Sequence, residues 1–232
     1  MPPTRPLLRA IHAPPATEAE LRLRLRRLAG LPLGAIAAAH GVALPAEARR
    51  SKGIVGQLLE RALGASAGSR AEPDFPGLGI ELKTIPVDAR GRPRESCFVA
   101  SLDLASFDRR WEGSGVAKKL ARVAWVAVEA APAVPLAERR CGAALIWSPS
   151  EEEARALRSD YEEIVELIDE GFGAGVTGHR GAVLQLRPKG RSAAHLRWAL
   201  DEEGAPVRTA PRAFYLRPAF TEAILRRHFA LP

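Results

Sequence analysis

The segment Ala71–Val87, AEPDFPGLGIELKTIPV, constrains the fold of this chain more than any other stretch. Its apolar residues favour an extended strand, in which successive side chains alternate between the two faces. Glu81 and Lys83 therefore share one face, while Ile80 and Leu82 lie on the other. The sequence predicts a strand that carries a charged pair on one face and an apolar anchor on the opposite face.

Asp74 precedes this strand across a segment rich in turn-forming residues, which we expect to fold its carboxylate back beside Glu81. Two carboxylates at one point suit Mg²⁺, which prefers hard oxygen ligands. Lys83 would then lie next to a water molecule and a scissile phosphate, as in a metal-dependent phosphodiesterase. The alternative is an exposed strand edge with a surface ion pair. The turn-forming residues are Pro73, Pro76, Gly77 and Gly79.

A third carboxylate is available on the helix expected from Lys52 to Leu63. Gly53, Gly56 and Glu60 lie within about 40° of one another on a face other than its apolar side, at about 100° per residue. A face of small residues allows close approach to the active strand. Glu60 is therefore a candidate for the same site, and an ordinary exposed glutamate is the alternative.

Composition excludes several classes of protein. The chain has 232 residues, 47% of them hydrophobic, which is enough for one large domain or two small ones. No apolar run approaches the roughly 20 residues of a membrane span, and the N-terminus lacks the apolar core of a signal peptide, so we expect a cytoplasmic protein with no membrane association. Cys97 and Cys141 stand alone and the five histidines are scattered, which predicts two buried thiols, no disulfide framework and no zinc site.

The net charge of +7 is concentrated at the N-terminus. Residues 1–70 hold eleven Lys/Arg against four Glu, and the remaining 23 basic and 23 acidic residues cancel. A basic region beside a phosphate-cleaving site would attract a polyanionic substrate, although it could also serve only solubility. Most of the cations are arginines, so lysine marks positions where a tunable ammonium is needed. The five lysines are Lys52, Lys83, Lys118, Lys119 and Lys189.

Patterning along the chain predicts a mixed α/β fold. Helices are expected from Thr17 to Gly30, over LPLGAIAAAH, from Lys52 to Leu63, around His195–Leu200 and from Pro218 to His228. Strands are expected at GIELKTIPV, ESCFVASLD, RVAWVAVEA and GAALIWS, which we place in one sheet, and at AVLQLRPKG and RAFYLR.

The longest predicted helix is strongly acidic. It begins near Ser148 or Ser150, ends at Gly171, and contains nine acids against Arg155 and Arg158. Such a face would repel DNA. It is either a solvated outer surface or a docking site for a partner.

Several segments together closely resemble the MutH family, the strand-nicking endonucleases of methyl-directed mismatch repair. They are KGIVGQLLERALGASAGS, DFPGLGIELKTIPVDARGRP, KKLARVAWVAVE, LIWSPSEEE, LQLRPK and FYLRPAF, and the resemblance runs from about residue 5 to 230. It implies a restriction-endonuclease-like fold, a central mixed sheet flanked by helices, with two lobes that form a DNA-binding cleft. The single endonuclease domain of residues 1–232 would have an N-terminal catalytic lobe of residues 1–110 and a C-terminal sequence-reading lobe of residues 111–232.

The resemblance also implies roles for individual residues. Glu60, Asp74, Glu81 and Lys83 match the catalytic set, with Mg²⁺ held by Asp74, Glu81, Glu60 and the Leu82 carbonyl; Mn²⁺ or Ca²⁺ could occupy the same oxygen site. Lys52 and Lys119 match basic residues near the cleavage centre. Phe98, Arg187, Pro188 and Tyr215 match DNA-contacting positions, the last three in the part that reads GATC and senses adenine methylation, and Lys189 adjoins them.

The implied activity is Mg²⁺-dependent nicking of the unmethylated strand at hemimethylated GATC sites, by a monomer that a MutL-type activator stimulates with MutS upstream. The helix reads KGIVG with no aromatic, and FDRRWEGSG differs in detail from the family. Two alternatives stay open. A restriction-type enzyme would cut both strands, and a basic DNA-binding module would use its acids only structurally.

Overall fold

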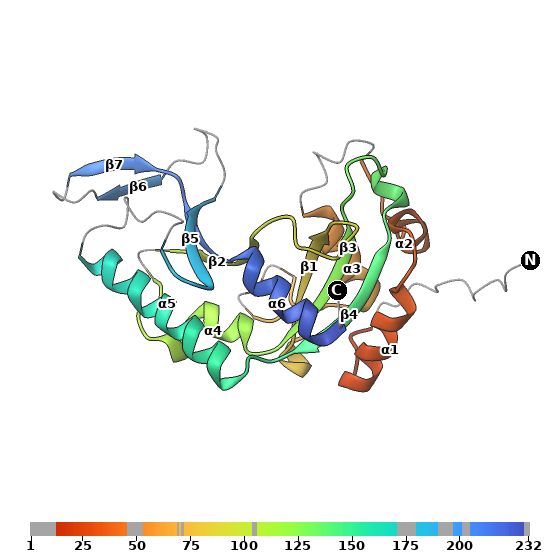
Figure 1. Ribbon diagram of the computed structural model, residues 1–232, viewed down its shortest axis with the longest axis horizontal. Coiled ribbons are helices and arrows are strands. Elements are labelled where there is room, and N and C mark those ends of the chain that lie inside the picture. Colours follow the sequence, from red (N-terminus) through yellow and green to blue (C-terminus); the bar gives the residue numbers. More distant parts are fainter. Residues whose placement is uncertain are drawn as a thin grey trace, which may run out of the picture. The chain divides into compact units, whose positions relative to one another are not determined.

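Two structural units share the chain, and each is assembled from separate segments. The computed structural model (Figure 1) describes residues 13–45, 53–68, 70, 72–103, 106–170, 180–189, 197–200 and 205–229. Unit 1 comprises Met1–Arg94, Arg122–Trp147 and His228–Pro232, and unit 2 comprises Glu95–Ala121 and Ser148–Arg227. This division differs from a single boundary near residue 110, because the strands of residues 122–147 belong with the N-terminal segment.

The helices of unit 1 begin with the predicted capped helix. The Thr17 side chain accepts a hydrogen bond from the backbone N–H of Glu20, which satisfies one of the unpaired donors at the start of the helix. The expectation of a helix between Thr17 and Gly30 is therefore confirmed. The helices that lie wholly within the described part of unit 1 are α1 (Glu18–Leu28), α2 (Leu33–His40) and α3 (Ile54–Leu63).

A buried arginine joins α1 to the end of α3. Arg24 is 6% exposed, and its Nη1 atom donates hydrogen bonds to the carbonyl oxygens of Leu63 (2.7 Å) and Ala13 (2.8 Å). Gly64 follows α3 with φ +80°, and a Cβ atom there would lie 2.6 Å from Arg24 Nη1. Only glycine combines this left-handed conformation with this close approach, so α3 ends here.

The sheet of unit 1 contains the strand expected at GIELKTIPV. β1 (Glu81–Val87) runs parallel to β3 (Val123–Glu129), which runs antiparallel to β4 (Cys141–Trp147). Leu82 pairs with Ala124 and Lys83 with Trp125. A parallel pair needs a long connection, and the whole of residues 88–122 intervenes between β1 and β3.

One face of this sheet packs against α1, α2 and α3, which Figure 1 shows beside it. Ile80 and Leu82 join the core on this face, as their alternation predicts, and burial of such side chains contributes about 25 cal/mol per Å². The helices supply Leu21, Leu25, Leu28, Leu33, Ile36, Leu58, Leu59 and Leu63, and the neighbouring strands supply Ala124, Val126, Val128 and Cys141.

Unit 2 has its own antiparallel sheet, with the strand order β2-β8-β5. A β-bulge interrupts β2 between Phe98 and Ala100, so Val99 lies opposite no partner residue. Val99 is fully buried. The ring centroids of Phe214 on β8 and Tyr161 are 5.2 Å apart. The strands are β2 (Cys97–Leu102), β5 (Leu184–Pro188) and β8 (Arg212–Leu216).

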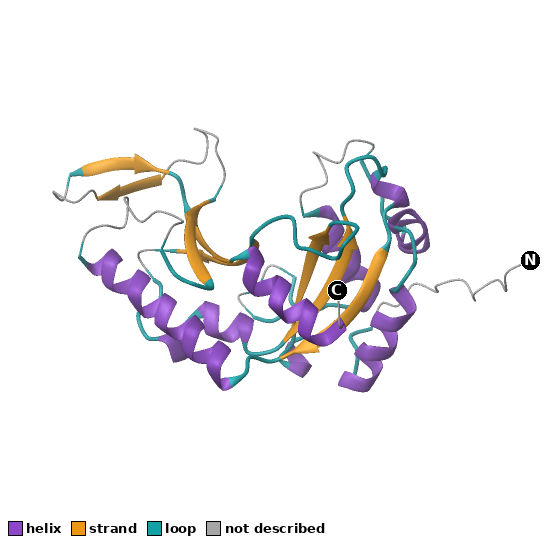
Figure 2. Ribbon diagram, viewed as in Figure 1, coloured by secondary structure: helices purple, strands orange, loops and turns teal. Residues whose placement is uncertain are grey.

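The helices of unit 2 include the predicted acidic helix. α5 (Glu151–Asp169) begins after Ser150, which forms a capping box with Glu153. Figure 2 shows it as the long helix of this unit. Unit 2 also contains α4 (Gly115–Leu120), which the sequence patterns did not predict, and most of α6 (Pro218–Phe229), which they did. Short 3-10 turns lie at Trp111–Gly113 in unit 2 and at Pro76–Leu78 and Leu136–Glu138 in unit 1.

Two expectations about secondary structure were wrong. The helix expected around His195–Leu200 is instead a strand, β6 (Arg197–Leu200), paired with β7 (Pro206–Thr209) in a hairpin. A segment this short carries too little periodicity to distinguish helix from strand, and backbone pairing decides it. The predicted strands also do not form one sheet, because β2 pairs with β8 rather than with β1. The mixed α/β class is confirmed.

Both cysteines are free thiols, but only Cys141 is buried, whereas Cys97 is half-buried. None of the helices in the described ranges has the length and apolar content needed to cross a bilayer.

Candidate active site

Glu81 and Lys83 form a buried ion pair on β1. The Nζ atom of Lys83 donates a hydrogen bond to Oε1 of Glu81 at 3.0 Å, and the two residues are 7% and 3% exposed. This excludes the alternative of a surface ion pair on an exposed strand edge. Burying two charges costs free energy that the mutual attraction offsets only in part, so net stability alone does not account for the pair, and it remains a candidate for the active site.

The turn before β1 returns the carboxylate of Asp74 to the strand. Phe75 and Ile80 exchange backbone hydrogen bonds of 2.9 and 3.3 Å across the 3-10 turn, and Gly79 takes φ +64°. Oδ2 of Asp74 accepts a hydrogen bond from the backbone N–H of Leu82 at 2.8 Å. The Asp74 carboxylate is therefore held against the strand one residue from Glu81, as the turn pattern predicts.

Glu60 is half-buried on α3, which packs on β1 through the shared core. Within the part of the chain that is described, no three His, Cys, Asp or Glu side chains gather closely enough to hold a metal ion together. A metal-ligating role for Glu60 therefore stays a prediction. Lys52 lies outside the described residues.

The donors around Asp74 have the chemistry that suits a hard divalent cation. Carboxylate oxygens from Asp74 and Glu81 and the backbone carbonyl of Leu82 come from adjacent positions, and all are hard oxygen ligands. Mg²⁺ usually keeps several waters and needs only one or two protein carboxylates. The residues present thus fit Mg²⁺, with Lys83 as the nearest cation on the same strand face.

The outer face of the sheet in unit 2 carries a second group of predicted residues. Tyr215, at the centre of the sheet, pairs with Phe98 on β2 and Gln185 on β5. The next row on this face has Ala213 between Ser101 and Arg187. The bulge in β2 shifts the register by one residue, which places Ser101 on the same face as Phe98.

Aromatic rings and cations alternate on this face. The Phe98 and Tyr215 rings meet edge to face, with centroids 5.7 Å apart, and Phe98 is 39% exposed. Lys189 Nζ lies 5.0 Å from the Phe98 centroid, and Arg187 Cζ lies 5.8 Å from that of Tyr215. Both are cation–π distances. Pro188 is exposed and lies between the two cations in sequence, but it pairs with Arg212, so its ring belongs to the opposite face of the strand.

Burial raises the pKa of the Tyr215 phenol, an effect that Arg187 opposes and Glu95 reinforces. The phenol therefore stays protonated and able to donate a hydrogen bond at neutral pH.

Comparison with known proteins assigns the chain to a family. A family model described as "DNA mismatch repair enzyme MutH" matches residues 63–160. This chain is also 51% identical over 219 residues to each of three proteins named "DNA mismatch repair protein MutH", from Salmonella paratyphi B, Salmonella newport and Salmonella typhimurium. The aligned residues cover 94% of this chain and 95% of each relative. The chain belongs to the MutH family. MutH proteins are DNA mismatch repair endonucleases, and membership gives this chain the same class of activity.

The matched range covers only some of the predicted MutH site residues. It includes Asp74, Glu81 and Lys83, whereas Arg187 and Tyr215 lie beyond it and are covered by the alignments to whole MutH proteins. Lys119, which was predicted to lie near the cleavage centre, is half-buried on α4 of unit 2, and Lys118 is exposed beside it.

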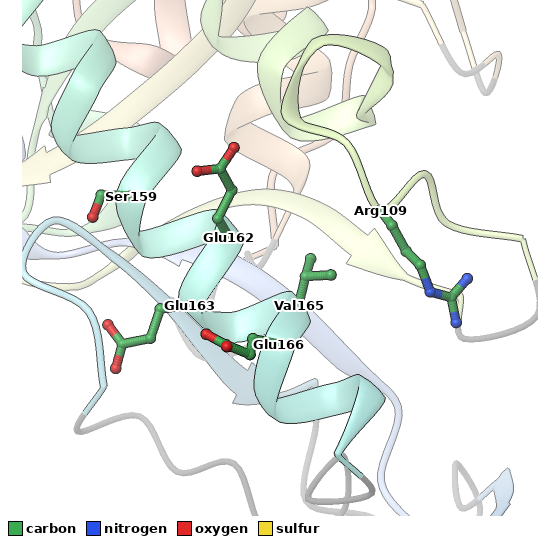
Figure 3. A pocket seen from close by; sticks show the side chains of 6 residues that line it. All are labelled: Arg109, Ser159, Glu162, Glu163, Val165 and Glu166. Atoms are coloured by element: carbon green, nitrogen blue, oxygen red, sulfur yellow. The ribbon is translucent and has the colours of Figure 1, made fainter.

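The acidic helix of this MutH-family chain bounds a hollow of about 530 Å³. Figure 3 shows three glutamates projecting from α5, with Arg109 contributed by a loop. Arg109 is paired with Asp169 at 2.9 Å, so the lining is acidic overall. None of the predicted catalytic or DNA-reading residues lines it, and DNA would be repelled. The lining consists of Arg109, Ser159, Glu162, Glu163, Val165 and Glu166.

Sequence reasoning missed Ser96 and Ser101, which accept hydrogen bonds from the predicted DNA-contacting cations Arg187 and Lys189, and Gln185, which bonds to Ser96. Gln185 Nε2 and Arg187 Nη1 both donate to Ser96 Oγ, at 2.8 and 3.0 Å, and Lys189 Nζ donates to Ser101 Oγ at 2.8 Å. The polar residue between two leucines in the LQL of β5 was the only sequence sign of this network.

Proposed function

We propose that this MutH-family endonuclease nicks the unmethylated strand of DNA at hemimethylated GATC sites, with Mg²⁺ as cofactor. The observation that carries the proposal is the buried Lys83–Glu81 pair beside the Asp74 carboxylate. Mg²⁺, when bound, supplies Lewis-acid chemistry that polarises the scissile phosphate and makes water a better nucleophile.

The protein residues divide the remaining work. Asp74 and Glu81, with the Leu82 carbonyl and Glu60, bind the cation. Lys83 orients the attacking water through its amino group, which Glu81 holds at 3.0 Å and which is excluded from bulk water. Accepting the proton of that water requires the neutral amine form of Lys83. One catalytic set per monomer supports cleavage of one strand, rather than the double-strand cut of a restriction-type enzyme.

Sequence reading is proposed for the outer face of the second sheet. The guanidinium of Arg187 can make a bidentate contact with guanine, worth roughly 1–3 kcal/mol of discrimination. A methyl group on adenine N6 occupies the major-groove edge. The ring of Tyr215, which lies on the same face as Arg187, would reject it sterically and through the lost hydrogen-bond donor.

Plasmid nicking tests the catalytic assignment. With Mg²⁺ and a supercoiled plasmid that carries one unmethylated GATC site, the wild-type protein should accumulate open circles, and linear product instead would favour the restriction-type alternative. Glu81→Ala and Lys83→Ala should abolish nicking and leave DNA binding measurable. Glu152→Ala and Arg155→Ala, which change exposed charged residues of α5, are controls. Retained cleavage by either active-site variant would refute the assignment.

Duplexes with unmethylated, hemimethylated and fully methylated GATC test the reading face. Tyr215→Ser should blunt the preference for unmethylated strands, whereas Tyr215→Phe, which keeps the ring, should retain the steric part. An unchanged preference in Tyr215→Ser would place the methylation sensor elsewhere.

Partners and assembly belong to the same proposal. We expect a monomer of 25.0 kDa whose nicking rate rises when a MutL-type activator and MutS act on a mismatch-containing substrate. Mass measurement in solution and nicking assays with each partner omitted test these points.

A further inference from the structure

The hydroxyl of Ser96 is a junction between a buried and an exposed side chain of β5. Gln185 is 5% exposed, and its Nε2 atom donates to Ser96 Oγ at 2.8 Å. Arg187 is exposed, and its Nη1 atom donates to the same oxygen at 3.0 Å. A serine hydroxyl has two acceptor lone pairs, so it can receive both donors at once.

This arrangement fixes the guanidinium of Arg187 at two points. Ser96 Oγ accepts from one end of the guanidinium, while the face of the Tyr215 ring lies 5.8 Å from its central carbon. An exposed arginine otherwise loses considerable rotamer freedom when it binds. Because Gln185 is buried and cannot reorient freely, it anchors Ser96, and Ser96 in turn restricts Arg187.

Preorganisation matters more for reading a base than for contacting a phosphate. A bidentate contact to guanine requires the guanidinium plane and direction to match the O6 and N7 atoms, whereas a phosphate accepts a cation from many directions. When a side chain is already held in its bound conformation, the protein binds more tightly, chiefly because less conformational entropy of that side chain is lost on binding.

We propose that Ser96 is a positioning residue that presets Arg187 for base reading, with Gln185 as its buried anchor. The inference rests on the proposed function, in which Arg187 reads a guanine of GATC. Ser96 acts through Arg187, so its removal should reduce discrimination between sequences rather than general affinity for DNA.

The experiment measures kcat/KM for nicking of two duplexes, one with GATC and one with its guanine replaced by adenine. Ser96→Ala should lower kcat/KM on GATC roughly tenfold and leave the altered site nearly unchanged, within the range expected for a weakened bidentate contact. Ser96→Thr keeps the hydroxyl and should stay within about twofold of the wild type. Ser96→Cys preserves size but substitutes a weak acceptor, so it should resemble Ser96→Ala. Ser159→Ala, an exposed serine on α5, is the matched control.

A double-mutant cycle tests whether Ser96 acts through Arg187. In the Arg187→Ala background, Ser96→Ala should cause no further loss, because the two residues act as one unit. Binding to non-specific DNA without metal should be unchanged in all Ser96 variants. Circular dichroism and thermal unfolding confirm that each variant is folded, and Ser96→Thr and Ser96→Cys provide the test if Ser96→Ala unfolds.

Different failures have different meanings. The positioning role would be overturned if Ser96→Ala and Ser96→Cys both kept the wild-type preference for GATC over the altered site. It would also be overturned if Ser96→Ala lowered kcat/KM on GATC as much in the Arg187→Ala background as in the wild type. If the wild type shows no preference for GATC, or Arg187→Ala leaves that preference intact, the proposed reading function itself fails.

Discussion

Asp160 on α5 accepts a hydrogen bond from the backbone N–H of Leu184, the first residue of β5, at 2.7 Å. The same carboxylate also accepts from the N–H groups of Ala182 and Val183, at 2.9 and 2.6 Å. Asp160 is 6% exposed, so one buried acid organises the whole approach to the strand that carries Arg187. The proposed reading face therefore depends on a contact from the opposite side of its sheet.

Asp160→Ala should destabilise the protein by about 1–3 kcal/mol for each buried N–H left unsatisfied, and it should weaken GATC discrimination as β5 loosens. Denaturant unfolding measures the first effect and nicking of altered sites the second. Glu163→Ala, a more exposed acid on the same helix paired with Arg180 at 3.6 Å, is the control and should change stability by less than about 0.5 kcal/mol. Equal stability of the two variants would contradict the anchoring role.

Lys83→Met should remove nicking and also cost about 3–5 kcal/mol of stability, because it leaves the buried Glu81 carboxylate without its ion-pair partner. The double variant Glu81→Leu/Lys83→Met should recover most of that stability while remaining inactive. Urea unfolding without metal tests both statements. A double variant no more stable than Lys83→Met would mean that the pair serves the fold as well as the chemistry.

The two tyrosines should titrate only above their ordinary range. Burial raises the pKa of both Tyr161 and Tyr215, which are the only tyrosines in the chain. Their contribution to stability is therefore fully present below the unfolded pKa of about 10 and is lost as the pH rises through the higher folded pKa values. Ultraviolet absorbance of tyrosinate during an alkaline titration measures this, and Tyr161→Phe isolates Tyr215. A midpoint below 10 for Tyr215 in the folded protein would contradict the expectation.

The two thiols should differ sharply in reactivity. Burial raises the pKa of Cys141 to about 12, and this residue is 1% exposed, whereas Cys97 is half-buried. Because the thiolate is the reactive species, a thiol reagent should modify Cys97 in the native protein and Cys141 only after unfolding. Mass spectrometry of the modified peptides identifies the site. Rapid native labelling of Cys141 would show that β4 opens readily.

Local pattern was sufficient for most elements. Thr17 caps the helix it was expected to begin, and Ser150, one of two serines expected to begin the acidic helix, caps that one, because capping depends on residues only three positions apart. The segment Arg197–Leu200 formed a strand instead, since four residues do not define a period and the partner strand supplies the missing hydrogen bonds.

For the site, the order of Asp74, Glu81 and Lys83 along one short segment determined their proximity, because a turn and an alternating strand bring them together without help from distant residues. The sequence by itself also placed the chain in its family. Burial of the Lys83–Glu81 pair, the separation of β2 from β1 and the tether from Ser96 to Arg187 were decided only by tertiary structure. The physical reason is that strand pairing and side-chain contacts between residues 96 and 187 are long-range, and no local periodicity records them.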